Sequence, residues 1–316
     1  MRPLRIFFAT DIHGSETCFR KFINAGQAYQ ADALVMGGDI TGKMIVLLVA
    51  GAGGIWSVQW LGARRTVTGD ELAALEKEIS MAGCYPYRTT PEEVAALEAD
   101  PDELKRVFRT TMQEAVRRWL LLAEERLRGT GIECYVTPGN DDDLFVDQAF
   151  ASLNGVTNPE SRLVHIKGEV EMISSGYSNR TPWNSPRELE EEQLAEKISA
   201  LAAQLQAPQR AIFNFHCPPY DVGLDTAPRL DATLKPVTGI GGVQMIPVGS
   251  TAVLEAITHF RPLLGLHGHI HESRGAVKVG PTLCVNPGSE YTEGILRGCL
   301  VLLDGKRVRD YLLTSG

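Results

Sequence analysis

The chain has 316 residues, of which 44% are hydrophobic and 22% are charged. A chain of this length buries enough apolar surface to fold without disulfides, so intrinsic disorder and a disulfide scaffold are excluded. Lys and Arg number 31 against 39 for Asp and Glu, and the formal charge of −8 disfavours nucleic acid as a partner. The six cysteines form no Cys-x-x-Cys pair, which is typical of reduced thiols.

Two apolar segments bear on the location of the protein. Residues 4–10 have the length of a strand and run directly into Asp11 without a small-residue cleavage site, so no secretory signal is expected. Residues 44–62 are interrupted by the Gly-rich tetrapeptide 51–54, whereas a membrane-spanning helix needs about 20 mostly apolar residues. We therefore expect a cytoplasmic protein with no membrane partner.

Short apolar strands alternate with amphipathic helices through most of the chain, which is the pattern of a layered α/β domain. In chain order, the pattern predicts strands at 5–10, 33–36, 132–136, 163–166, 169–174, 211–215, 263–266, 282–285, 299–303 and 307–313. It predicts helices at 16–29, 186–206 and 250–260. No internal repeat or low-complexity linker divides the chain, so residues 1–316 are expected to form a single domain.

An insertion of about 90 residues, from about 43 to 130, separates the second and third of these strands. It is predicted to contain a β-hairpin over 44–67 and two helices, near 70–82 and 102–128. The hairpin has more apolar side chains than a free ribbon should expose, namely Trp56, Val58, Trp60 and Leu61. Two partners could bury these side chains: the long helix of the same insertion, or a second copy of the chain in a homo-oligomer built through the hairpin. The insertion contains no histidine, so we expect no metal ligand in it.

Metal-ligating residue types follow five of the predicted strands. They are Asp11 and His13, Asp39, Asn140, His216, and His269 with His271. Ligand sites in open α/β sheets lie beyond the carboxyl ends of the strands, so we expect these side chains to converge. Carboxylates, imidazoles and an amide oxygen suit hard or borderline divalent ions. Seven ligands are too many for one ion and suit two ions that share a bridging carboxylate.

The ordered motifs resemble those of the calcineurin-like metallophosphoesterases. They read Asp11-Ile12-His13, Gly38-Asp39, Gly139-Asn140, His216 and Gly268-His269-Ile270-His271. The resemblance implies a four-layer α/β/β/α sandwich and two divalent ions, drawn from Mn, Fe, Zn, Ni and Co. It also implies that Asp11, His13 and His271 hold the first ion. Asn140, His216 and His269 would hold the second, with Asp39 bridging the two.

The segment Val285-Asn286-Pro287-Gly288-Ser289 also resembles the late turn of the small bacterial and archaeal phosphodiesterase branch of that family. An ordinary Pro-Gly turn would have the same sequence.

One departure from the family pattern concerns the residue after the Gly-Asn pair. The family usually has a His there, which protonates the leaving group or steadies the substrate phosphate, whereas this chain has Asp141. Asp141 is expected to be ionised and a poor proton donor; its alternative role is the N-cap of the segment beginning at Asp143. His267 is either a residue that orients a ligand or a simple strand-end residue. The candidate catalytic residues are therefore Asp39, Asn140, Asp141 and His267.

A loop with Asn179, Arg180, Trp183 and Arg187 offers arginines that could bind a phosphate, or it packs on the surface. The predicted function is a metal-dependent phosphoric ester hydrolase, a phosphodiesterase acting on a small molecule or nucleotide by metal-hydroxide attack on phosphorus. The alternative is a metal-binding scaffold on the same fold with little turnover. A nuclease with a basic groove around Arg64, Arg65 and Arg88 is a third possibility.

Overall fold

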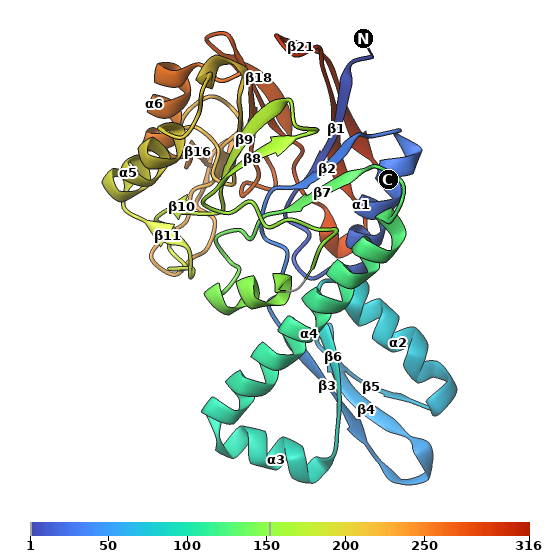
Figure 1. Ribbon diagram of the computed structural model, residues 1–316. Helices are drawn as coiled ribbons and strands as arrows, with labels where there is room; N and C mark the ends of the chain where they lie inside the picture. Colours follow the sequence, from blue (N-terminus) through green and yellow to red (C-terminus); the bar gives the residue numbers. More distant parts are fainter. Residues whose placement is uncertain (1, 152) are drawn as a thin grey trace.

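The computed structural model describes residues 2–151 and 153–316. Two β-sheets stack face to face, and helices cover both outer faces (Figure 1). The first sheet has the order β21-β20-β1-β2-β7, with β1 (Leu4–Ala9), β2 (Ala33–Met36), β7 (Glu133–Val136), β20 (Arg297–Leu303) and β21 (Val308–Ser315). The second has the order β18-β19-β17-β12-β9-β8, with β8 (Leu163–Ile166), β9 (Val170–Ser175), β12 (Ile212–Phe215), β17 (Leu264–Leu266), β18 (Gly275–Val279) and β19 (Thr282–Asn286).

Parallel pairing runs through the centre of both sheets. β1 pairs in parallel with β2, and β2 pairs in parallel with β7. In the second sheet β12 pairs in parallel with both β9 and β17, and β17 pairs in parallel with β19. Antiparallel strands β20, β21, β18 and β8 lie outside this parallel core. The parallel strands therefore end together, and the loops that follow them meet at one edge.

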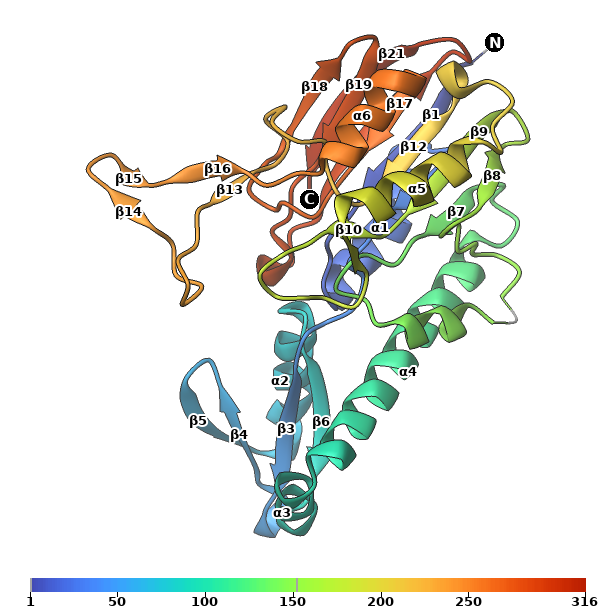
Figure 2. The same cartoon turned by 90° about the vertical axis from the view of Figure 1, so that its left-hand side faces the viewer.

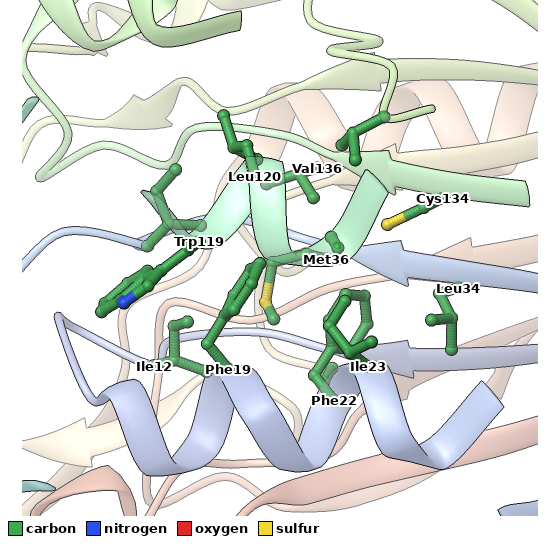
Figure 3. Close-up of a cluster of buried hydrophobic side chains, with 14 of the residues drawn as sticks. Ile12, Phe19, Phe22, Ile23, Leu34, Met36, Trp119, Leu120, Cys134 and Val136 are labelled. Atoms are coloured by element: carbon green, nitrogen blue, oxygen red, sulfur yellow. The ribbon is translucent and has the colours of Figure 1, made fainter. Parts of the chain in front are cut away.

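Alternation along β1 shows how the layers form. Phe7 and Ala9 face α1 (Glu16–Ala28) and the C-terminal part of α4 (Pro101–Leu127), in the core cluster of Figure 3. Ile6 and Phe8 point the other way and pack between the two sheets. A third core lies between the second sheet and the helices α5 (Glu191–Ala202) and α6 (Thr251–Phe260). The predicted four-layer α/β/β/α sandwich is confirmed.

The insertion extends from one end of this sandwich (Figure 2) and differs from its prediction. Its sheet has the order β5-β4-β3-β6, with β3 (Ile45–Ala50), β4 (Trp56–Trp60), β5 (Ala63–Val67) and β6 (Tyr85–Thr89). Its helices are α2 (Gly69–Met81), α3 (Pro91–Ala99) and α4. The second half of the hairpin expected over 44–67 is not one strand but two, because the chain turns back at Leu61 and Gly62. Both residues have a positive φ of the kind that a two-residue hairpin needs. β6 and α3 were not predicted. Pro86 disfavours a strand over residues 85–89 from sequence, but β6 lies at the edge of its sheet, where proline is tolerated.

The apolar face of the insertion sheet is covered by α2, and not by the long helix as the intramolecular alternative supposed. Val58 and Trp60 pack with Leu72, Leu75 and Ile79 in a core separate from those of the sandwich. The indole nitrogen of Trp60 donates to Glu78 Oε1 at 2.7 Å. The aromatic side chains that suggested an uncovered hairpin are thus accounted for within the chain, and a homo-oligomer through residues 43–67 stays a prediction.

Smaller elements complete the fold. They are β10 (Ser178–Asn179) with β11 (Glu188–Leu189), and a ribbon formed by β13 (Thr226–Pro228), β14 (Thr238–Gly239), β15 (Gly242–Val243) and β16 (Met245–Pro247). The ribbon projects from the sandwich (Figure 2). Across the described ranges, no helix has the length and apolar character required to cross a bilayer.

The separate core of the insertion predicts that it can unfold locally. Leu75 is 2% exposed, and Leu75→Ala should destabilise the insertion by about 3 kcal/mol because it leaves a cavity. Leu61→Ala is the matched control, because Leu61 is 80% exposed and its loss should change stability by less than about 0.5 kcal/mol. Hydrogen exchange in Leu75→Ala should accelerate in α2 and β4 and stay slow in α5. Equal acceleration in α5 would show that the insertion and the sandwich unfold together.

Candidate metal centre

The seven predicted ligand residues meet where the parallel strands end. Asp11 and His13 follow β1, Asp39 follows β2, and Asn140 follows β7 in the first sheet. The remaining three follow strands of the second sheet, with His216 after β12 and His269 and His271 after β17. The loops after β1 and β2 run side by side, since the amide of Asp11 donates to the carbonyl of Gly38 at 3.0 Å and that of His13 donates to Asp39 at 2.9 Å. Residues up to 260 positions apart thus share one site.

Their donor atoms form two groups, and His13 and Asp39 form a third with Asp141. Ligand atoms of Asp11, His13 and His271 lie within 4.8 Å of one another. Those of Asp39, His216 and His269 form the second such group. Nε2 of His13 and Nε2 of His271 are 3.0 Å apart, and Nε2 of His216 is 3.0 Å from Asn140 Oδ1. The residues expected to hold the first ion thus lie together, and the assignment of ligands to two ions stays a prediction.

Asp39 belongs to the second group and also reaches the first. Its Oδ2 is 3.6 Å from His13 Nε2 and 3.4 Å from His216 Nε2. Asp39 is 2% exposed, and burial raises its pKa to about 6, although His216 opposes that rise. A cation on either side would favour the ionised carboxylate. This position is the one that a bridging carboxylate requires.

The carboxylates around His216 set its protonation. Its Nδ1 lies 3.1 Å from the carbonyl of Gly37, which accepts only, so Nδ1 carries a proton. Burial lowers the pKa of His216, but the neighbouring carboxylates outweigh it and raise the pKa to about 10. Burial, together with other histidines nearby, lowers the pKa of His13 and of His269 to about 3, so these two are neutral. Imidazoles and carboxylates crowded in this way fit divalent ions, which would displace the Nε2 proton of His216 and balance the charge of the carboxylates.

Backbone strain is concentrated in these loops. Asp11, His13, Asp39 and His269 have φ values of 53°, 38°, 48° and 67°, in the left-handed region that non-glycine residues rarely adopt. Such strain costs on the order of 1–3 kcal/mol per residue and persists where the surroundings enforce it. Four of the seven predicted ligands are therefore held in conformations that the fold imposes.

Close packing explains the glycines that precede two of the ligands. A Cβ on Gly38 would lie 2.3 Å from His216 Nδ1, and one on Gly139 would lie 2.2 Å from Asp39 Oδ1. No larger residue fits at either position without displacing a ligand from a different strand. The Gly-Asp and Gly-Asn pairs thus reflect how closely the loops approach one another.

Asp142 and Arg187 brace the loop that carries Asn140. The buried carboxylate of Asp142 accepts hydrogen bonds from the amides of Gly139 at 2.6 Å, Ile40 at 3.0 Å and Thr41 at 2.8 Å, so it joins the loops after β2 and β7. Arg187 is 1% exposed and donates to the carbonyls of Asp142 and Asp143. It therefore supports the loop and does not reach into the site as a phosphate ligand.

The late turn braces the opposite side. The side-chain amide of Asn286 donates to the carbonyl of Ile270 at 2.9 Å, between the two histidines of the last motif. The hydroxyl of Ser289 donates to the carbonyl of Asp11 at 2.6 Å. The late turn therefore contacts the loops of the first and last motifs, and its resemblance to the phosphodiesterase branch stays a prediction.

Asp141 lies at the edge of the first group with two partners that the sequence did not reveal. Its Oδ2 is 2.5 Å from Lys43 Nζ and 4.0 Å from His13 Nδ1, and its Oδ1 accepts from the hydroxyl of Ser185 at 2.6 Å. Burial raises the pKa of Asp141, but hydrogen bonds from Lys43 and Ser185 outweigh it and lower the pKa to about 2. Asp141 is therefore ionised at neutral pH. The expectation that it caps a helix is wrong, because Asp143 is the N-cap of the short helix Leu144–Phe150.

His267 is fully buried and belongs to neither group. Its Nδ1 lies 2.8 Å from the carbonyl of Phe215 and 3.1 Å from that of Cys217, on either side of His216. This placement favours an orienting role over contact with a substrate. From the loop considered above, Trp183 is 63% exposed and Arg180 pairs with Glu190, so neither is part of the cluster.

Tyr291 is a neighbour that no motif indicated. Its ring centroid lies 4.8 Å from that of His13 and 6.0 Å from that of His271. It comes from a short helix, Tyr291–Glu293, just beyond the late turn. Lys43 and Ser185 come from loops, and Tyr291 comes from a single helical turn. None has a recognisable sequence pattern, so only the folded structure could place them here.

Comparison with known proteins supports the same fold. No family model matches the chain. The uncharacterized protein MJ1162 of Methanocaldococcus jannaschii is 30% identical over 158 residues, which are 49% of this chain and 64% of that protein. The match thus spans less than two thirds of the relative.

Solved structures extend the likeness over the whole chain. TT1561 of Thermus thermophilus has a TM-score of 0.55 at 14% identity, covering 99% of this chain and 98% of that one. The Escherichia coli phosphoesterase YfcE has a TM-score of 0.32 at 11% identity and 98% coverage of both chains. A dimetal phosphatase from Danio rerio has a TM-score of 0.44 at 9% identity and 99% coverage of both. The likeness to TT1561 shows a shared fold, and the layers and strand-end motifs of the chain resemble those of the calcineurin-like metallophosphoesterases.

The central position of Asp39 predicts that both ion sites depend on it. Asp39→Asn keeps the shape of the side chain and removes the charge, so it should release both ions and reduce phosphoester hydrolysis roughly 10²–10³-fold. His13→Ala and His216→Ala should each weaken mainly the group to which the residue belongs. Metal content, measured by mass spectrometry on protein purified without added metal, checks this order. Retention of two ions and a near-native rate in Asp39→Asn would refute the bridging assignment.

Proposed function

We propose that the protein is a dinuclear-metal phosphodiesterase that acts on a small molecule or nucleotide. The observation that carries the proposal is the pair of donor groups, with the Asp39 carboxylate a member of the second and 3.6 Å from His13 of the first. Two divalent ions, when bound there, would supply an activated water and polarise the phosphoryl oxygens. Histidine and carboxylate ligands without thiolates suit Mn, Fe, Zn, Ni or Co.

The chain's own residues have distinct parts in this proposal. Asp11, His13 and His271 would hold one ion, Asn140, His216 and His269 would hold the other, and Asp39 would contact both. Asp142 and Arg187 keep the Asn140 loop in register with the Asp39 loop. Because bracing, strain and close packing fix the donors before any ligand binds, little reorganisation is needed.

The late turn supports a diester as the substrate. Residues 285–289 resemble the turn of the small bacterial and archaeal phosphodiesterase branch, and the hydroxyl of Ser289 donates to the carbonyl of Asp11 at 2.6 Å.

The six cysteines, none of them in a disulfide, support a cytoplasmic location as part of the same proposal.

The scaffold alternative makes a different prediction from the enzyme. Wild-type protein loaded with Mn²⁺ should hold two ions per chain and hydrolyse bis(p-nitrophenyl) phosphate faster than p-nitrophenyl phosphate. Asp39→Asn is the inactive control, which excludes a contaminating hydrolase. Two bound ions with no turnover on any ester in a broad panel would favour the scaffold and refute the enzyme.

Leaving-group chemistry gives a second test. An ionised Asp141 has no proton to donate, and a positioned acid is worth roughly 10²–10⁴ in rate when the leaving group is an alkoxide. The wild-type enzyme should therefore prefer aryl or phosphoryl leaving groups over simple alkyl diesters. Asp141→His should narrow the difference between aryl and alkyl substrates. Equal rates on both in the wild type, with chemistry shown to limit the rate, would point to an acid elsewhere in the site.

A further inference from the structure

We infer that Lys43 is a substrate-binding residue that contacts a phosphoryl oxygen at the edge of the first donor group. The inference rests on the proposed function and assigns a specific cation to its substrate. Lys43 is the first residue of the insertion, between the Asp39 loop and β3. Its ammonium lies 2.5 Å from Asp141 Oδ2, and the same carboxylate oxygen is 4.0 Å from His13 Nδ1. One carboxylate thus separates Lys43 from a predicted ligand.

The backbone that leads to Lys43 is held on both sides. Asp142 accepts from the amides of Ile40 and Thr41, and the hydroxyl of Tyr85 accepts from the amide of Gly42 at 2.8 Å. Tyr85 belongs to β6 of the insertion and is 4% exposed. Three successive amides therefore have fixed, buried partners, and Lys43 leaves the loop from a defined point.

Lys43 is also the cation that the site otherwise lacks. Among the ion pairs of residues 2–151 and 153–316, it is the one Lys or Arg side chain that pairs with Asp11, Asp39 or Asp141. Arg187, which the sequence offered as a phosphate ligand, is buried against backbone carbonyls instead. An anionic substrate that approaches these carboxylates needs a positive group besides the ions.

The geometry lets Lys43 bind an anion without giving up its present contact. An ammonium has three donors, so one can remain on Asp141 while another reaches a phosphoryl oxygen. The Lys43 side chain is 58% exposed, whereas that of Asp141 is 20% exposed and is held independently by Ser185. Asp141 thus anchors a lysine whose outer face is open to solvent. Lysine binds phosphate as a point charge, which suits this role.

The test measures phosphate affinity, which does not require turnover. Titration calorimetry of inorganic phosphate into the Mn²⁺-loaded protein should show Lys43→Gln binding roughly 10- to 100-fold more weakly than wild type, since a charge-assisted hydrogen bond is lost. Lys43→Arg keeps the charge and should bind within about threefold of wild type. Lys105→Gln is the matched control, because Lys105 pairs with Asp102 on the exposed surface of α4 and should bind phosphate like the wild type.

Metal content and kinetics separate this inference from its alternatives. Lys43→Gln should retain two ions, and on a diester its KM should rise more than its kcat falls. Wild-type phosphate affinity in a Lys43→Gln protein with both ions bound would overturn the inference and leave the proposed function standing. Loss of ions in both Lys43→Gln and Lys43→Arg would also overturn it, because Lys43 would then support the ion sites. Absence of diester hydrolysis by the wild type overturns the proposed function itself.

Discussion

The structure depends on how closely five strand-end loops approach one another. Two sheets, each covered by helices on one face, must be stacked so that strands from both end at one edge. Only then do carboxylates and imidazoles from residues 11 to 271 come within 4.8 Å of each other in two groups. This crowding is unfavourable for the protein alone, because buried carboxylates repel one another and the buried Nδ1 of His13 has no hydrogen-bond partner. The hydrophobic cores of the sandwich and the braced loops hold the donors in place against that cost, as expected of a site completed by cations.

The braces that oppose this crowding are themselves buried polar groups. Asp142 satisfies amides from two loops, Arg187 satisfies the carbonyls behind Asp142, and Asn286 ties the last motif to the late turn. Each makes hydrogen bonds to backbone groups, and buried polar groups that find such partners help to specify one structure. These three residues set the relative positions of the loops, whereas the motif residues supply the donor atoms. A change in a brace should therefore alter ion spacing before it alters ion identity.

The strand-end residues could be predicted because they follow from local patterns, whereas the four layers were implied by the resemblance of the ordered motifs to a known family. An apolar run ending in Asp, Asn or His is visible in the sequence, and parallel strands bring such ends together. The bounds of β2 and β8 were predicted as they occur, since each is a short apolar run between polar residues. The insertion was predicted less well. Pro86 disfavours a strand, although β6 is an edge strand, and the tight turn at Leu61 lies within a segment that reads as one continuous strand. The partners of Asp141 were missed for another reason, since Lys43 and Ser185 are brought to it by loops whose course depends on tertiary contacts.

The insertion is joined to the site by more than the chain connection. The hydroxyl of Ser15, just after the loop with His13, donates to the carbonyl of Met81 at the end of α2, at 2.7 Å. The hydroxyl of Tyr85 in β6 accepts from Gly42, just after the loop with Asp39. The turn between α2 and β6 therefore contacts the loops after both β1 and β2, which carry ligands on either side of the site. Because α2 belongs to the separate core of the insertion, that core's packing helps to set the position of these loops. An insertion without a histidine can thus act on the metal centre through two hydroxyl groups and the backbone that they hold.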